Sequence, residues 1–319
     1  MKRVVNYLFF VSTIAGSAVA PSAQAWGCKG HQTVALIAEK YLTPEARQFA
    51  QKLLMENPVD PKLSRYCGSA SHDAMADAST WADDVRNERR NGPWHYIDVP
   101  RGAQRGPLEA YCGTEGCVTR AMSEQLAILK DKNAQGVKRA EALRYVIHFV
   151  GDLHQPLHDI TNADEGGNCV PVKYLRRKPR GHGHSYSPNL HSIWDTAILE
   201  RDAEGAEAAE YAETLEALFA PDIAVWQKAG IHLDDWVWEG FEAAEATVYG
   251  NLMPGIAIEP NVPVHSCAED NNIGDRLLRQ NLVADEVYQD KAALVVEKRL
   301  AQGGVRLALI LNEAAKSAQ

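Results

Sequence analysis

Residues 136–158 read GVKRAEALRYVIHFVGDLHQPLH, a stretch in which apolar side chains recur with helical spacing. The apolar positions at i, i+3, i+4 and i+7 are Leu143, Val146, Ile147 and Val150. This pattern predicts a helix with one buried face, and Pro156 should end it because proline cannot continue a helix. His148 and Asp152 are four residues apart, so the helix presents an imidazole and a carboxylate side by side.

Helical patterns recur through the rest of the chain. Thr43 followed by Pro44 is a helix start, and that helix is expected to run to about Met55. Further helices are expected over 71–89, 203–219, 234–249 and 282–315, whereas 94–99 and 170–175 look extended. We therefore expect an all-α fold, a single mainly helical domain over 26–319 with a minor β-hairpin.

The first 25 residues have the features of an export signal. Lys2 and Arg3 precede a mostly apolar stretch over 7–20, and Ala23-Gln-Ala25 is a small-x-small cleavage pattern. The apolar stretch is too short for a membrane anchor, and no later segment approaches a membrane span. The mature protein is expected to begin at Trp26, to be secreted or periplasmic, and to have no stable membrane association. No obligate protein partner is evident.

Six cysteines in an exported chain favour disulfides over thiols. Cys112 and Cys117 enclose a short loop and are expected to pair. Cys28, Cys67, Cys169 and Cys267 leave three pairings open.

The net charge is −9, and it becomes −11 once Lys2 and Arg3 are removed with the signal. An acidic protein does not bind polyanions through its general surface. This charge argues against a protein that coats DNA. It allows a nuclease only if the site has its own source of positive charge, such as metal ions.

Several histidines have spacings typical of a metal site. His191 and Asp195 repeat the four-residue spacing, and His158 follows Pro156, where a turn can direct it back. One such pair is more often a surface contact; two pairs together favour a metal. Imidazole and carboxylate without thiolate suit catalytic zinc better than structural zinc.

Trp26 offers a further ligand if it is the first residue of the mature chain. A free α-amino group and its carbonyl oxygen form a five-membered chelate, and the amine deprotonates near neutral pH. The alternative is a tryptophan that only packs the new terminus.

One family shows the same motifs in the same order. The motifs are Trp26-Gly-x-x-Gly-His31, Ser79-Thr-Trp-Ala-Asp83, Trp94-His-Tyr-Ile-Asp98, His148-Phe-Val-Gly-Asp152, Gln155-Pro-Leu-His158-Asp159, Gly166-Gly-Asn168 and Asn189-Leu-His-Ser-Ile-Trp-Asp195. The chain resembles the secreted trinuclear-zinc single-strand nucleases, which also act as 3′-nucleotidases and share their fold with zinc-dependent phospholipase C.

The resemblance implies three zinc sites. One would use Asp83, His95, His148 and Asp152. A second would use the Trp26 amine and carbonyl, His31 and the shared Asp152. The third would use His158, His191 and Asp195.

The resemblance also implies a mechanism. A metal-bridged hydroxide would attack the phosphorus of single-stranded DNA, RNA or a 3′-nucleotide and leave 5′-phosphate products. Asp83 and Asp152 would act in catalysis through the metals, and Arg86 would neutralise charge on the phosphorus; a surface arginine is the alternative for Arg86.

The same resemblance gives a reason for single-strand specificity. Tyr96 would stack on a base, Asp98 would accept hydrogen bonds from base amino groups, and Asn168 would orient the phosphate or sugar. A duplex hides both the face and the edge of the base. The main competing function is a phospholipase C that uses the same ligands; a different class is a non-catalytic zinc-binding protein.

Overall fold

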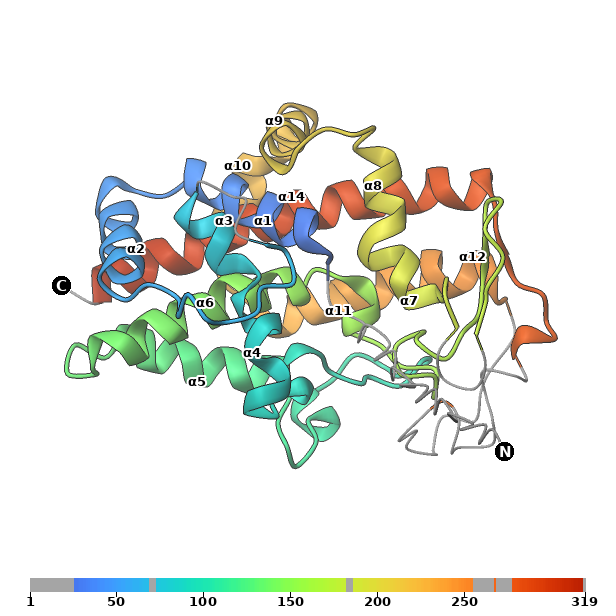
Figure 1. The fold of residues 1–319 in the computed structure, drawn as a ribbon, viewed down its shortest axis with the longest axis horizontal. Coiled ribbons are helices and arrows are strands. Elements are labelled where there is room, and N and C mark those ends of the chain that lie inside the picture. The colour runs from blue at the N-terminus through green and yellow to red at the C-terminus, as the bar shows by residue number, and fades with distance from the viewer. Residues whose placement is uncertain (1–25, 69–72, 182–185, 255–266, 268–276, 318–319) are drawn as a thin grey trace, which may run out of the picture.

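A 32-residue helix, α14 (Glu286–Ser317), runs along most of the length of the molecule and carries the other helices (Figure 1). The computed structural model describes residues 26–68, 73–181, 186–254, 267 and 277–317, so the expected signal peptide lies outside the described residues. Helix α1 (Cys28–Lys40) packs along α14 and also contacts α3 (Ala74–Ser79) and α9 (Ala208–Leu218).

The predicted central helix is present as α6 (Gly136–Asp152), and it packs against α5 (Val118–Lys130) in a helical hairpin. All four side chains of its predicted apolar stripe are buried. After α6 the chain turns into a short 3₁₀ helix, η3 (Pro156–His158). The site residues of this region therefore lie on a buried helix and on the turn that follows it.

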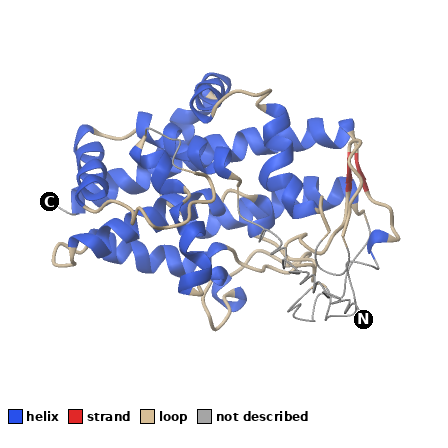
Figure 2. Cartoon of the chain, in the orientation of Figure 1, coloured by secondary structure: helices blue, strands red, loops and turns tan. Residues whose placement is uncertain are grey.

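The remaining elements are mostly helical, as expected for an all-α fold (Figure 2). They are α2 (Pro44–Glu56), α4 (Trp81–Arg89), η1 (Gly92–His95), η2 (Leu108–Tyr111), α7 (Leu190–Ser192), η4 (Ile193–Ala197), α8 (Ile198–Asp202), α10 (Ala220–Ala229), α11 (Leu233–Ala243), η5 (Ala244–Tyr249) and α12 (Gly250–Leu252). Elements η4 and η5 are π-helical turns inside longer helical segments.

Strand structure is confined to one end of the molecule (Figure 2). Strand β1 (Lys173–Tyr174) pairs in parallel with β2 (Val283–Ala284). Among the described residues of 171–189, the two arms are joined by isolated antiparallel bridges, such as Pro171 with Asn189. The expected extended run 170–175 is thus reduced to a short strand, and its partner comes from a distant part of the chain.

Two predicted elements have different boundaries in the structure. The expected helix 71–89 is two helices separated at Thr80, and 71–72 lie outside the described residues. The Arg65 guanidinium donates to the Asp77 carbonyl at 2.7 Å and to Thr80 Oγ1 at 3.1 Å, so it takes an acceptor that a continuous helix would use. His95 ends the 3₁₀ helix η1, whereas the sequence predicted that 94–99 is extended.

Helix boundaries elsewhere follow local capping. Thr43 accepts a hydrogen bond from the Ala46 amide and confirms the predicted start of α2. Asp285 does the same for Tyr288, so α14 begins at Glu286 rather than at 282.

The structure selects one of the three open disulfide pairings. Cys112 pairs with Cys117 as expected, and the other two bridges are Cys28–Cys67 and Cys169–Cys267. The first of these ties the start of α1 to the loop before α3, close to His31.

Candidate metal centre

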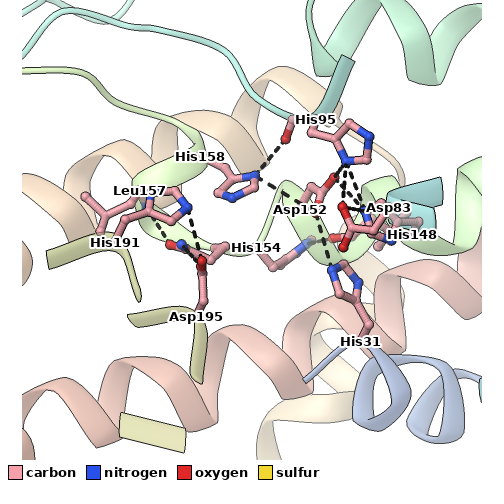
Figure 3. Close-up of polar contacts among 12 residues, drawn as sticks. His31, Asp83, His95, His148, Asp152, His154, Leu157, His158, His191 and Asp195 are labelled. Carbon is pink, nitrogen blue, oxygen red and sulfur yellow. Dashed lines mark hydrogen bonds and ion pairs between the residues drawn. The ribbon is translucent and has the colours of Figure 1, made fainter. Parts of the chain in front are cut away.

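Four of the predicted ligands from three elements form one buried group (Figure 3). His95 Nδ1 lies 3.1 Å from Asp152 Oδ2, and His148 Nε2 lies 3.3 Å from the same oxygen. Asp83 Oδ1 on α4 is 3.7 Å from His95 Nδ1 and 3.8 Å from His148 Nε2. The four ligand atoms therefore converge on one point from different parts of the chain.

His31 approaches Asp152 from the opposite side. Its Nε2 lies 3.5 Å from Asp152 Oδ1, and its ring stacks on His148 with centroids 4.0 Å apart. Gly151 makes this approach possible, because a Cβ there would be only 2.6 Å from His31 Nδ1. One oxygen of Asp152 thus faces His31 while the other faces His95 and His148, as a shared ligand requires.

Trp26 is completely buried. The amide of Gly27 donates to the Asp195 carbonyl at 2.7 Å, which fixes the start of the described chain against a residue of the site.

His158, His191 and Asp195 form a second buried group, and their ligand atoms lie within 4.8 Å of one another. His191 Nε2 is 3.2 Å from Asp195 Oδ2. Asp195 lies in the π-helical turn η4, a local distortion that is frequent at functional sites. Figure 3 shows His158 between the two groups, with its Nδ1 3.9 Å from Asp152 Oδ1.

Backbone carbonyls orient the histidine rings. His148 Nδ1 donates to Ser79, His158 Nδ1 to His95 and His191 Nδ1 to Gly166, at 2.6, 2.7 and 2.7 Å. Each of these bonds places the proton on Nδ1 and makes Nε2 the acceptor nitrogen, which is how proteins present imidazole to a metal. The break between α3 and α4 at Thr80 leaves the Ser79 carbonyl available to His148.

Gln155 is a further residue of the candidate site, and the sequence pointed to it only as part of a motif. Its Nε2 donates to Asp195 Oδ1 at 2.6 Å, and its Oε1 accepts from the Leu157 amide at 2.6 Å. It thus holds a ligand of the second group and the turn that carries His158. Its place in the motif 155–158 was the only sequence signal.

Several buried polar atoms of these residues have no hydrogen-bond partner among the described residues. They are both ring nitrogens of His31, His95 Nε2, Asp83 Oδ1 and Asp152 Oδ1. Buried polar atoms without partners are costly in a protein that binds nothing there. Their nitrogen and carboxylate chemistry, with no thiolate, suits zinc.

The pKa values in the site also show that its ionisable groups are buried without full compensation of their charge. The pKa of His191 is lowered to about 3, mainly by burial and next by the neighbouring His158. Burial raises the pKa of Asp195 well above its ordinary range, although the hydrogen bond from Gln155 acts in the opposite direction. Burial opposes a charge on His148, but Asp152 and Asp83 together raise its pKa to about 9. A divalent cation can replace such a proton and compensate the buried carboxylates.

The other predicted site residues surround these groups. Arg86 NH1 lies 4.0 Å from Asp83 Oδ1, and its side chain is largely buried. Tyr96 is 38% exposed, and the Asn168 side-chain amide donates to the Glu165 carbonyl at 2.9 Å. The Asp98 side chain is exposed at the surface. Its pKa is nevertheless raised to about 7, mainly because the surrounding protein desolvates the carboxylate and next because Asp164 and Glu165 are close to it.

Comparisons with known proteins agree with this geometry. A family model described as S1/P1 Nuclease matches residues 26–316. Nuclease P1 of Penicillium citrinum is 30% identical over 298 residues, which cover 90% of this chain and 97% of the relative. Nuclease S1 of Aspergillus oryzae is 29% identical over 304 residues (92% and 93%), and Endonuclease 4 of Arabidopsis thaliana is 28% identical over 314 residues (91% and 89%).

Proposed function

The chain belongs to the S1/P1 nuclease family, and on that premise we propose that it is a zinc-dependent endonuclease that hydrolyses single-stranded DNA and RNA. We extend the proposal to 3′-nucleotides, with 5′-phosphate products from polynucleotides. The observation that carries it is the pair of adjacent, buried His/Asp groups, because several nitrogen and oxygen atoms of the group around Asp152 have no hydrogen-bond partner among the described residues.

We propose three zinc ions, held as the resemblance implied. The first would be bound by Asp83, His95, His148 and Asp152, and the second by Trp26, His31 and the other oxygen of Asp152. The third would be bound by His158, His191 and Asp195. When bound, zinc supplies Lewis-acid stabilisation of phosphoryl oxygens and acidifies water.

The protein's own residues would position and stabilise the substrate. Arg86, next to Asp83, supplies a fixed positive charge for the phosphoryl oxygens as negative charge develops on them. Asp83 and Asp152 hold the histidines in one arrangement, and Gln155 holds Asp195. The side-chain bond of Asn168 to the Glu165 carbonyl supports a role in ordering the loop that faces the phosphate or sugar.

Tyr96 and Asp98 would form the base platform. Tyr96 directly follows the ligand His95 and is partly exposed, so a base stacked on it would lie next to the metal groups. Stacking on an aromatic ring contributes ~1–3 kcal/mol per base. A paired base cannot offer its face and its edge at once, so the platform favours single strands.

A phospholipase C activity is not favoured. The relatives named above are all nucleases or endonucleases. Within the part of the chain that the structure describes, no helix is long and apolar enough to cross a membrane.

Export and domain organisation complete the proposal. Three disulfides fit an extracellular protein. We propose cleavage before Trp26 and release to the periplasm or the medium, since the family match begins at that residue. We also propose one nuclease domain over 26–319, supported by contacts of α14 with α1, α2, α6 and α9.

The test is hydrolysis by zinc-loaded protein that begins at Trp26. Single-stranded DNA, duplex DNA and phosphatidylcholine vesicles are assayed side by side. We expect 5′-phosphate products from the single strand at a much higher rate than from the duplex. Lipid cleavage without nuclease activity, or equal rates on both DNAs, would overturn the substrate assignment.

A further inference from the structure

A cavity of about 480 Å³ lies against the segment that flanks the proposed ligand His95, since Pro93 and Tyr96 both line it. One wall is the chain from Tyr96 to Asp98, and the other is the disulfide loop over 111–117. Its volume falls within the range of ~300–1,000 Å³ that is typical of small-molecule sites. The cavity therefore has room for a nucleobase whose phosphate is held at the metal centre.

The disulfide loop is a fixed wall. Cys112 is bonded to Cys117, and the Gly116 amide donates to the Gly113 carbonyl at 3.1 Å. The Trp94 indole donates to the Glu115 carbonyl at 3.2 Å. The backbone of Glu115 is thus anchored to the segment that carries His95 and Tyr96, and its position relative to the base platform is set by the fold.

The charge of the cavity is negative. Among its lining residues the charged side chains are Asp98 and Glu115, and none is a lysine, arginine or histidine. The Tyr96 hydroxyl lies in the electrostatic field of both carboxylates, together with that of Glu165 and of the Arg86 guanidinium, and the Tyr96 ring is partly exposed. A phosphate is repelled from such a cavity, whereas hydrogen-bond donors on a base edge are attracted.

We propose that Glu115, together with Asp98, makes this nuclease select bases that present an amino group. The proposal rests on the proposed function and names its base preference. A carboxylate accepts a hydrogen bond from the N4 amino group of cytosine. Uracil has a carbonyl oxygen at that position, which a carboxylate repels. Uracil therefore forms no hydrogen bond to either carboxylate and places a carbonyl oxygen against their negative charge.

The test compares two single-stranded homopolymers that differ only in the base, oligo(dC) and oligo(dU), at a pH well above 7. Values of kcat/KM are measured for the zinc-loaded wild-type protein, for Glu115→Gln and for Glu124→Gln. Glu124 is an exposed residue of α5 outside the cavity and is the matched control. Glutamine keeps the size of the side chain but removes its charge and adds a donor that uracil can accept.

We expect the wild type and Glu124→Gln to prefer oligo(dC) by about tenfold. In Glu115→Gln this ratio should fall at least threefold, partly through faster cleavage of oligo(dU), with an unchanged melting temperature. An unchanged ratio in Glu115→Gln, or a wild type that cleaves both substrates equally, would overturn the role of Glu115 and leave the nuclease function intact. A wild type that cleaves neither would overturn the nuclease function itself.

Discussion

Gly240 on α11 lies against a buried carboxylate that follows the proposed zinc ligand His158 in the chain. A Cβ at this position would be 1.8 Å from Asp159 Oδ2, 2.8 Å from Asp159 Cγ and 3.1 Å from Arg299 NH2. Asp159 directly follows His158 and is completely buried, and neither of its oxygens has a hydrogen-bond partner among the described residues. Its ion partner is Arg299, 3.9 Å away.

Gly240→Ala should therefore be strongly destabilising. An ordinary contact is about 3.5 Å, so the carboxylate must withdraw by roughly 1.5 Å or more, and burial leaves it no route to solvent. Overpacking of a core typically costs about 1–3 kcal/mol, and displacing a buried polar group from its surroundings costs about 1–3 kcal/mol. These effects overlap, so we expect a loss of about 3 kcal/mol or more in the free energy of unfolding.

The assay is urea denaturation of the zinc-loaded protein, with zinc content measured in parallel. The zinc held by His158 should be released at a lower chelator concentration, because Asp159 must move. Gly136→Ala is the matched control. Gly136 is the first residue of α6, and the atom nearest to a Cβ at this position would be 3.7 Å away. We expect this control to be neutral or slightly stabilising. If Gly240→Ala is within about 0.5 kcal/mol of the wild type, the packing argument for Asp159 is wrong.

Two further predictions concern the chain terminus and pH. A Gly-Ser extension before Trp26 should lower the bound zinc by one ion and depress turnover, because it removes the α-amine of Trp26 as a ligand. Mass spectrometry of the zinc-loaded protein measures the zinc content. Normal zinc content together with normal turnover would refute that role of Trp26. The pKa of Glu297 is raised from 4.5 to about 7, mainly by burial and next by the charge and the hydrogen bond of Asp202. The stability from this raised pKa is complete below about pH 4.5 and is lost as the pH rises through 7. Glu297→Gln should therefore gain melting temperature over the wild type between pH 5 and 8; parallel curves would contradict the assignment.

Local sequence predicted the elements that depend on local rules. The stripe of Leu143 and Val146 predicted α6, and Thr43 with Pro44 predicted the start of α2, because side-chain periodicity and capping act within a few residues. Pairs four residues apart predicted which ligands share an element, as for His148 with Asp152. The ordered motifs predicted the family.

Contacts between distant segments decided the rest. The Arg65 side chain separates α3 from α4, and no pattern within 71–89 shows that an acceptor is lost to a residue outside it. The partners of Cys28 and Cys169 depend on which loops the packed helices bring together.

The same division holds at the site. The sequence by itself determined which residues can bind zinc, because ligand chemistry and helical spacing are local properties. Only the tertiary structure decided that His31 reaches Asp152 under Gly151, that Gln155 holds Asp195, and that the wall carrying Glu115 faces Tyr96. These contacts join residues on separate elements, and their distances are set by how the helices pack.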